Sequence, residues 1–371
     1  MNVTSNKRLL ALDVMRGITI AGMILVNNPG SWTYAYTPLT HAQWNGLTPT
    51  DLVFPFFMFI MGISTYISLR KYNFTFSTPA ALKIIKRTIV IFLIGIAINW
   101  FALLCYTHDP LPFAHIRILG VMQRLALCYG ASALIALLIK HKYIPYLIVA
   151  LLVGYFIILV TGNGFAYNET NILSIVDRSI LGDAHMYQDN HIDPEGLLST
   201  IPSIAHVLIG FCVGKLLMEV KDIREKLERL FLIGTILTFA GFLLSYGCPL
   251  NKKIWSPTFV LVTCGLGSSL LALLVWIIDI KGYKRWSHFF ESFGVNPLFI
   301  YVLADVLAIL LSVITITYQG ESASLQQAFY ASTLQPMFGN EGGSLAYAIL
   351  FVLLNWAIGY ILYKKKIYIK I

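Results

Sequence analysis

The stretch from residue 26 to residue 51 concentrates side chains that can do chemistry. It contains His41, with Asn27 near its start, Asn45 soon after the histidine and Asp51 at its end. Histidine titrates near neutral pH, so it can act as a general base or carry an acyl group. An asparagine amide can donate a hydrogen bond to a developing oxyanion. Aromatic residues of the same stretch suit a sugar-binding surface or an aromatic belt at a membrane interface. They are Trp32, Tyr34, Tyr36 and Trp44.

A second group of polar side chains lies in residues 161–200. Asp193 and Glu195 come just before an apolar run that starts at Ile201. Acids at this position stabilise a helix N-terminus through its dipole, and they can equally bind a substrate or orient His41. Asp51 poses the same alternative, because it ends a Thr-Pro-Thr-Asp sequence at the start of another apolar run, where an acid caps a helix.

Composition identifies the elements that must position these residues. The 371 residues are 57% hydrophobic and 12% charged, and the mean hydropathy is +0.72. Soluble domains carry about 25% charged residues, so the sequence predicts a polytopic membrane protein. The length of the apolar runs indicates helices rather than a barrel. The ten predicted spans are Leu9–Val26, Leu52–Leu69, Arg87–Cys105, Ile118–Ile139, Ile144–Val160, Ile201–Leu217, Leu230–Tyr246, Thr258–Ile278, Val295–Ile316 and Leu345–Tyr363.

The distribution of lysine and arginine predicts the orientation of the chain. Most of its 27 basic residues fall in alternate connecting segments if the N-terminus is cytoplasmic. Both termini are then cytoplasmic, and residues 27–51 and 161–200 form outward loops of a single membrane domain that spans residues 1–371. The net charge of +9 is explained by this topology and by anionic lipid, not by nucleic acid. The five cysteines form no metal or redox motif, and we predict no metal site.

A bundle with basic segments on one side and a histidine on the other suits an acyl-coenzyme A donor. The phosphorylated nucleotide would bind cations near the cytoplasmic side, and the arm that bears the thioester would cross an apolar interior. Ionisable residues inside a span are functional candidates. The predicted phosphate-binding residues are Arg8, Arg16, Lys83, Lys86 and Arg124.

Nine sequence blocks, in this order, resemble motifs of the heparan-α-glucosaminide N-acetyltransferase family. They run from near the N-terminus to the C-terminus. The blocks are LDVMRG (12–17), VN (26–27), HAQWNGLTPTDLVFP (41–55), GVMQRL (120–125), DRSILGDAHMYQ (177–188), DPEGLL (193–198), NKKIWS (251–256), GVNPL (294–298) and KKIYIKI (365–371).

The resemblance implies transfer of an acetyl group from cytoplasmic acetyl-CoA to the amine of a glucosamine residue outside. It matches the family's active-site histidine to His41 and its nearby asparagine to Asn27. Arg8 matches the arginine at the membrane end. The acids of the DPEG motif match Asp193 and Glu195, which we expect to bind the sugar together with Trp44 and Asn45.

Some features depart from the family pattern. The loop between Asn27 and His41 is longer than in the lysosomal members, and their N-terminal luminal region and first span are missing. A bacterial inner-membrane enzyme that acts on a periplasmic amino sugar is therefore expected. Two other functions stay open, an amino-sugar transporter and an O-acyltransferase that acts on a glycan hydroxyl. Assembly as a homodimer is also left open.

Overall fold

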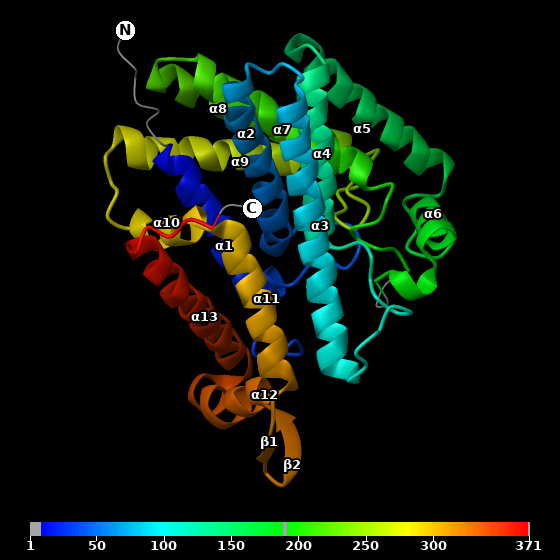
Figure 1. The fold of residues 1–371 in the computed structure, drawn as a ribbon, viewed down its shortest axis with the longest axis vertical. Coiled ribbons are helices and arrows are strands. Elements are labelled where there is room, and N and C mark those ends of the chain that lie inside the picture. Colours follow the sequence, from blue (N-terminus) through cyan, green and yellow to red (C-terminus); the bar gives the residue numbers. More distant parts are fainter. Residues whose placement is uncertain (1–8, 188–190, 370–371) are drawn as a thin grey trace.

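The computed structural model describes residues 9–187 and 191–369 (Figure 1). The regular structure of these residues is helical except for one two-stranded hairpin. The first part of the chain forms α1 (Leu10–Asn27), α2 (Val53–Leu69), α3 (Thr78–Thr107), α4 (Val121–Leu138), α5 (Ile144–Thr161), α6 (Ile172–Leu181) and α7 (Thr200–Glu219). The second part forms α8 (Ile223–Leu244), α9 (Pro257–Val275), α10 (Ser287–Val295), α11 (Pro297–Val313), β1 (Thr315–Tyr318), β2 (Glu321–Ser324), α12 (Leu325–Phe329) and α13 (Gln335–Lys364).

Nine helical segments of the described residues are long and apolar enough to cross a membrane. The number is ten if α10 and α11, which meet at 87°, form one bent span. The predicted all-helical membrane bundle is therefore confirmed. The predicted starts of three spans are wrong, because the third span begins at Thr78, the seventh at Ile223 and the last at Leu325. Hydropathy detects only the part of a helix that lies in hydrocarbon, and all three helices begin in more polar sequence.

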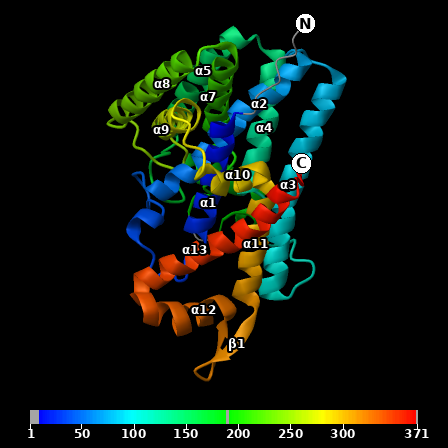
Figure 2. The same ribbon diagram turned by 90° about the vertical axis from the view of Figure 1, so that its left-hand side faces the viewer.

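Five spans form the centre of the bundle. The spans that contain α1, α2, α4, α7 and α9 bury 61–67% of their residues, whereas those of α3, α5, α8 and α13 bury 11–33%. Figure 2 shows α1, α2 and α4 between α3 and α8. The outer helices expose apolar side chains to the surroundings, as lipid-facing helices do.

Helices α2 and α7 touch through their backbones. A Cβ atom on Gly62 would lie 2.1 Å from the carbonyl oxygen of Val207, and one on Gly210 would lie 2.2 Å from that of Phe59. Only glycine permits this approach, which is typical of membrane helix pairs. The contact fixes α7, and the polar segment that precedes it, against the helix that follows His41.

The C-terminal part of the chain differs from the prediction. The predicted ninth span runs to Ile316, but α11 ends at Val313 and Ile316 lies in the antiparallel hairpin β1–β2. The hairpin and α12 lie at the opposite extremity of the molecule from α8 (Figures 1 and 2). This part reaches the segment that follows α1, as described below.

The connecting segments define two ends of the bundle. The His41 end consists of residues 28–52, 108–120, 162–187, 191–199 and 245–256, and hydrogen bonds join these segments to one another. The lysine-rich end contains residues 70–77, 139–143 and 220–222. The helices alternate between the two ends.

Candidate active site

His41 and Asp51 form a hydrogen-bonded pair at the His41 end. Nδ1 of His41 lies 2.7 Å from Oδ1 of Asp51. The aspartate side chain is 1% exposed, whereas 46% of the histidine side chain is exposed. Because a carboxylate accepts hydrogen bonds, this contact assigns the proton of the neutral ring to Nδ1. The lone pair of Nε2 is then available to a substrate.

Asp51 is itself held by the backbone. It lies in the 3-10 turn η2 (Pro49–Leu52), and its Oδ2 accepts hydrogen bonds from the N–H and the hydroxyl of Thr48, both at 3.0 Å, and from the N–H of Ala42. The two roles that the sequence left open for Asp51 are therefore both present, since one oxygen caps the turn and the other contacts His41.

Lys252, between α8 and α9, is the third member of this group. Its Nζ lies 3.0 Å from Nδ1 and 3.2 Å from Nε2 of His41, and 3.7 Å from Oδ1 of Asp51. Burial lowers the pKa of Lys252, and the negative charges of Asp51 and Glu195 oppose that effect. An ammonium group thus faces the imidazole ring that the sequence identified as the reactive group.

The segments around His41 hold one another in place. The indole N–H of Trp44 donates to the carbonyl oxygen of Phe165 at 3.0 Å, and its ring centroid lies 4.7 Å from that of Tyr167. The side chain of Asn251 donates to the amide oxygen of Asn45 at 3.2 Å. Trp44 and Asn45 therefore join the loop to two other segments of the His41 end.

The first part of the loop is attached to the C-terminal part of the chain. Ser344 donates from its hydroxyl to the carbonyl oxygen of Ser31 and accepts from the Ser31 N–H, at 2.9 and 3.0 Å. The N–H of Gly30 donates to the carbonyl oxygen of Ser344, and the side chain of Gln326 donates to that of Pro29. Residues 29–31, which belong to the part of the loop that is longer than in the lysosomal family members, are thus anchored to the C-terminal part of the chain.

Asn27 is the last residue of α1, and its side chain is exposed. Helix α1 contacts the turn η2 that carries Asp51. The neighbouring Asn28 instead closes the helix, because its side chain donates to the carbonyl oxygen of Ile24 at 2.8 Å. Of the two adjacent asparagines, Asn27 is the one whose amide is not engaged in that helix end.

Asp193 and Glu195 bind Arg117 rather than His41. The guanidinium Nη2 lies 2.6 Å from Oδ1 of Asp193 and 2.6 Å from Oε2 of Glu195. Burial alone would lower the pKa of Arg117, but the two carboxylates raise it well above its ordinary value. Burial likewise opposes the ionisation of Glu195, and Arg117 and Arg124 outweigh it, so the pKa of Glu195 is lowered. The three side chains form one charged cluster.

Arg124 lies apart from the other predicted phosphate ligands. Its buried guanidinium donates to the carbonyl oxygen of Gly196 at 3.0 Å and to the hydroxyls of Ser199 and Ser203. It also packs over the ring of Trp255. Arg124 therefore contacts residues at the start of α7, and it does not line the cavity that Arg16 and Lys83 line.

A cavity of about 490 Å³ opens among α1, α2, α3, α4 and α11. Arg16, Lys83 and Arg87 line it, and none of its lining residues is an acid. The guanidinium of Arg16 bonds to Asp13 and to the Ser64 hydroxyl, each at 2.8 Å. Lys86 is exposed on α3 outside the lining, and Arg8 lies outside the described residues. Apart from these cations the walls are largely apolar, with small hydroxyl side chains.

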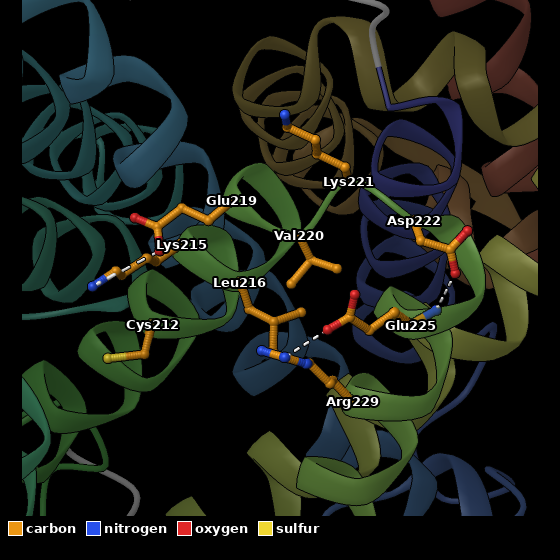
Figure 3. Close-up of a pocket in the computed structure, with 9 residues that line it drawn as sticks. All are labelled: Cys212, Lys215, Leu216, Glu219, Val220, Lys221, Asp222, Glu225 and Arg229. Atoms are coloured by element: carbon orange, nitrogen blue, oxygen red, sulfur yellow. Dashed lines mark hydrogen bonds and ion pairs between the residues drawn. The ribbon is translucent and has the colours of Figure 1, made fainter.

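A larger groove of about 680 Å³ lies between α7 and α8 (Figure 3). It has three cations and three acids in its lining. Lys215 pairs with Glu219 at 4.0 Å and Arg229 with Glu225 at 2.6 Å, as Figure 3 shows. Arg16 of the smaller cavity is paired with Asp13, but that cavity has no acid in its own lining, whereas the groove places three acids beside its cations. The smaller cavity is therefore the better candidate for a phosphorylated ligand.

A narrow apolar space adjoins the cavity on the side of the His41 end, and it is too tight to hold a water molecule. It shares Phe57, Leu125 and Leu298 with the cavity, and Tyr301 is one of its other lining residues.

Sequence reasoning missed Lys252 and Arg117 as members of the site. Both belong to the few basic residues that lie outside the segments predicted to be cytoplasmic, and the sequence alone suggested no role for them. A signal was present, because two buried acids need a cation and few cations are available on that side of the bundle. Which cation pairs with which acid depends on contacts between distant segments, here 76 to 78 residues apart for Arg117.

Fold and site together define a class of multi-pass membrane protein. This chain has a histidine–carboxylate pair at one end of its helix bundle and a cavity lined by cations within it. Residues 8–246 match the model of a protein family described as "Heparan-alpha-glucosaminide N-acetyltransferase, catalytic".

The chain belongs to the heparan-alpha-glucosaminide N-acetyltransferase family. The human protein of that name is 31% identical over 365 residues, which cover 81% of this chain and 53% of that protein. The mouse protein is 28% identical over 434 residues, which cover 99% of this chain and 61% of that protein. The chain thus spans little more than half the length of these curated relatives.

Proposed function

We propose that this chain is a transmembrane acetyltransferase that moves acetyl from acetyl-CoA to the amine of a glucosamine-type sugar. The observation that carries the proposal is the pair of complementary sites, a cavity lined by cations within the bundle and a polarised histidine at the His41 end. Family membership supports the same reaction.

Acetyl-CoA fits the cavity by charge and by shape. Its phosphates bind Arg16, Lys83 and Arg87, and its pantetheine arm follows the apolar wall and the hydroxyls of Ser64 and Ser68 toward the narrow space. The arm carries the thioester toward the His41 end.

His41 provides the acid–base chemistry in this proposal. Asp51 holds the ring so that Nε2 accepts the proton of the acceptor amine while the nitrogen attacks the thioester carbon. The new C–N bond forms as the C–S bond breaks, and the CoA thiolate takes up the proton. Asn27 donates a hydrogen bond to the oxyanion. In the two-step alternative Nε2 attacks the thioester first, and an acetyl-histidine then reacts with the amine.

The orientation of the chain follows from its charges. The lysine-rich end faces the cytoplasm, where acetyl-CoA is made, and the His41 end faces the periplasm. We propose that the membrane is a bacterial inner membrane and that the acceptor is a periplasmic amino sugar. Trp44 and Asn45 help to bind it directly, whereas Asp193 and Glu195, which are buried and paired with Arg117, act only through the segments that they hold.

The test uses the purified protein in liposomes with radiolabelled acetyl-CoA and glucosamine. We expect labelled N-acetylglucosamine, and loss of its formation in His41→Ala. Undiminished transfer by that variant would remove His41 from the mechanism. A transporter would instead move labelled glucosamine into the liposomes without acetyl-CoA.

The histidine–aspartate pair also favours a second candidate, O-acyl transfer, because the same arrangement activates hydroxyl nucleophiles. The two functions separate when glucosamine and N-acetylglucosamine are compared as acceptors. Only an O-acyltransferase modifies the second sugar, whose nitrogen is already acylated.

A further inference from the structure

We propose that the tail segment, residues 367–369, forms one wall of the donor cavity and that the side chain of Asn296 holds it there. This role rests on the proposed acetyl transfer, and it adds to the donor site residues other than its cations. Ile369 is a lining residue of the cavity of about 490 Å³. The junction of α10 and α11 lines the same cavity through Val295 and Pro297.

The tail segment joins two sequence blocks that contribute no reactive group, GVNPL (294–298) and KKIYIKI (365–371). The amide nitrogen of Asn296 donates to the carbonyl oxygen of Ile367, and its amide oxygen accepts from the N–H of Ile369, each at 2.8 Å. Figure 1 shows the end of the chain running past α10 to the start of α11. Both hydrogen-bonding groups of one amide thus bind a single backbone segment.

The side chain of Asn296 serves the tail segment instead of its own helix. Asparagine at the position before a helix usually caps it by accepting from a backbone N–H. Asn296 precedes α11 but makes no such cap, and it is only 1% exposed. A buried amide that lost its two partners would be left unsatisfied, so these hydrogen bonds favour the position of the tail segment beside the cavity.

The anchor lies next to a cation that is expected to bind phosphate. A Cβ atom on Gly294 would lie 2.0 Å from the carbonyl oxygen of Asp13, so α10 and α1 touch through their backbones. The guanidinium of Arg16 donates to the carbonyl oxygen of Gly294 at 3.2 Å. Asn296 follows that glycine by two positions, so the tail segment is attached to the part of the cavity that holds Arg16.

A turn at the end of α13 directs the tail segment toward this anchor. Lys366 has a left-handed backbone with a φ of 55°. The N–H of Ile367 donates to the carbonyl oxygen of Leu362, and that of Lys366 to the carbonyl oxygen of Tyr363, each at 3.0 Å. This pattern is the Schellman motif of helix C-termini. The tail segment is therefore held at its start by the turn and beyond it by Asn296.

Ile369→Glu tests the wall directly. We expect it to raise the Kd for acetyl-CoA about tenfold or more at low salt, because a carboxylate in the lining repels the phosphates. Tyr368→Glu is the matched control, since it adds the same charge one position earlier, at an exposed residue outside the lining. Its Kd should be lower than that of Ile369→Glu by about threefold or more. Equilibrium dialysis of the purified protein with radiolabelled acetyl-CoA measures both.

Asn296→Ala tests the anchor. It should raise the KM for acetyl-CoA about tenfold, with a smaller fall in kcat, because the reacting groups lie elsewhere. A chain that ends after Lys366 should show a similar rise. In that shortened chain Asn296→Ala should raise the Kd no further, because the residue acts through the segment that is missing. If the Asn296→Ala protein does not fold, the two glutamate variants, which keep the anchor, still decide the question.

Three results would overturn the assignment. One is a Kd for the Ile369→Glu protein that is no higher than that of the Tyr368→Glu protein. Another is an Asn296→Ala effect on the Kd that is as large in the shortened chain as in the full chain. The third is tighter binding by the shortened chain, since the tail segment would then obstruct the cavity. Failure of the unaltered protein to bind acetyl-CoA would instead refute the proposed function.

Discussion

Asp51→Asn should separate the orienting role of this residue from its capping role. In the protein, Oδ1 contacts Nδ1 of His41 at 2.7 Å, and Oδ2 accepts three hydrogen bonds, from Thr48 and Ala42. An asparagine keeps one accepting oxygen, and that oxygen can serve Thr48 and Ala42. Its NH₂ group then faces Nδ1 and donates to it, so the ring proton moves to Nε2. The lone pair that must accept the substrate's proton is lost.

The expected loss follows from this change of tautomer. Asparagine in place of the aspartate of an aspartate–histidine pair lowers kcat by about 10⁴ in serine proteases. The exposed His41 ring can turn more freely than a buried one, so we expect about 10²–10⁴-fold, or about 3–5 kcal/mol of activation free energy. A neutral amide oxygen caps the turn more weakly than the carboxylate does, and this should cost no more than about 0.5–2 kcal/mol of stability, the cost of losing a cap altogether.

The assay compares the kcat of acetyl transfer and the melting temperature in the same detergent. Thr48→Val is the matched control, because it removes the hydroxyl whose single proton is shared between Asp51 and the carbonyl oxygen of Thr40 but leaves the contact of Asp51 with His41. It should lower stability as Asp51→Asn does, while kcat falls by less than about tenfold. An Asp51→Asn protein that keeps more than about a tenth of its kcat would refute the reasoning.

Three other outcomes are expected. Arg117→Met leaves two buried carboxylates without their cation and should destabilise the fold by about 3–5 kcal/mol, measured by denaturation. Burial raises the pKa of Asp177 to about 6, so the folded state keeps that proton to higher pH than the unfolded chain, and stability falls as pH rises from about 4 to 6. Asp177→Asn should therefore match the unaltered protein near pH 4 and exceed its stability by about 3 kcal/mol at pH 7.5. Lys83→Ala should raise the KM for acetyl-CoA about tenfold at low salt and more than Lys86→Ala does, because only Lys83 lines the cavity.

Membrane helices were predictable because the bilayer demands long apolar runs. The ends of the helices were less predictable. Lys83 and Lys86 belong to α3, although they lie before the apolar run that predicted this span. The turn between α10 and α11 was not predictable either. There the side chain of Asn296 bonds to the backbone of Ile367 and Ile369, 71 and 73 residues further along the chain.

The same limit applies to the candidate site. His41 and Asp51 lie ten residues apart in one polar stretch, and their contact could be anticipated from local sequence. Lys252 reaches His41 across 211 residues, and nothing in its own surroundings distinguishes it from Lys253. Arg124 differs in another way. An arginine within a span suggested binding of a ligand anion, whereas in the structure two hydroxyls and a carbonyl oxygen accept hydrogen bonds from its guanidinium.

The region that matches the family model, residues 8–246, does not contain every residue of the candidate active site. Residues 8–246 supply His41, Asp51, Arg117 and the acids of the cluster. Lys252 and the residues that anchor the inserted loop, Gln326 and Ser344, come from the remainder of the chain. The cavity likewise takes Val295, Pro297, Leu298 and Ile369 from that remainder. Because Ser344 and Gln326 hold residues 29–31 and Lys252 contacts the ring of His41, residues 247–369 contribute to the surroundings of the histidine and of the loop that precedes it. Differences in acceptor choice among related chains should therefore follow these later residues together with the inserted loop, and not the histidine pair itself.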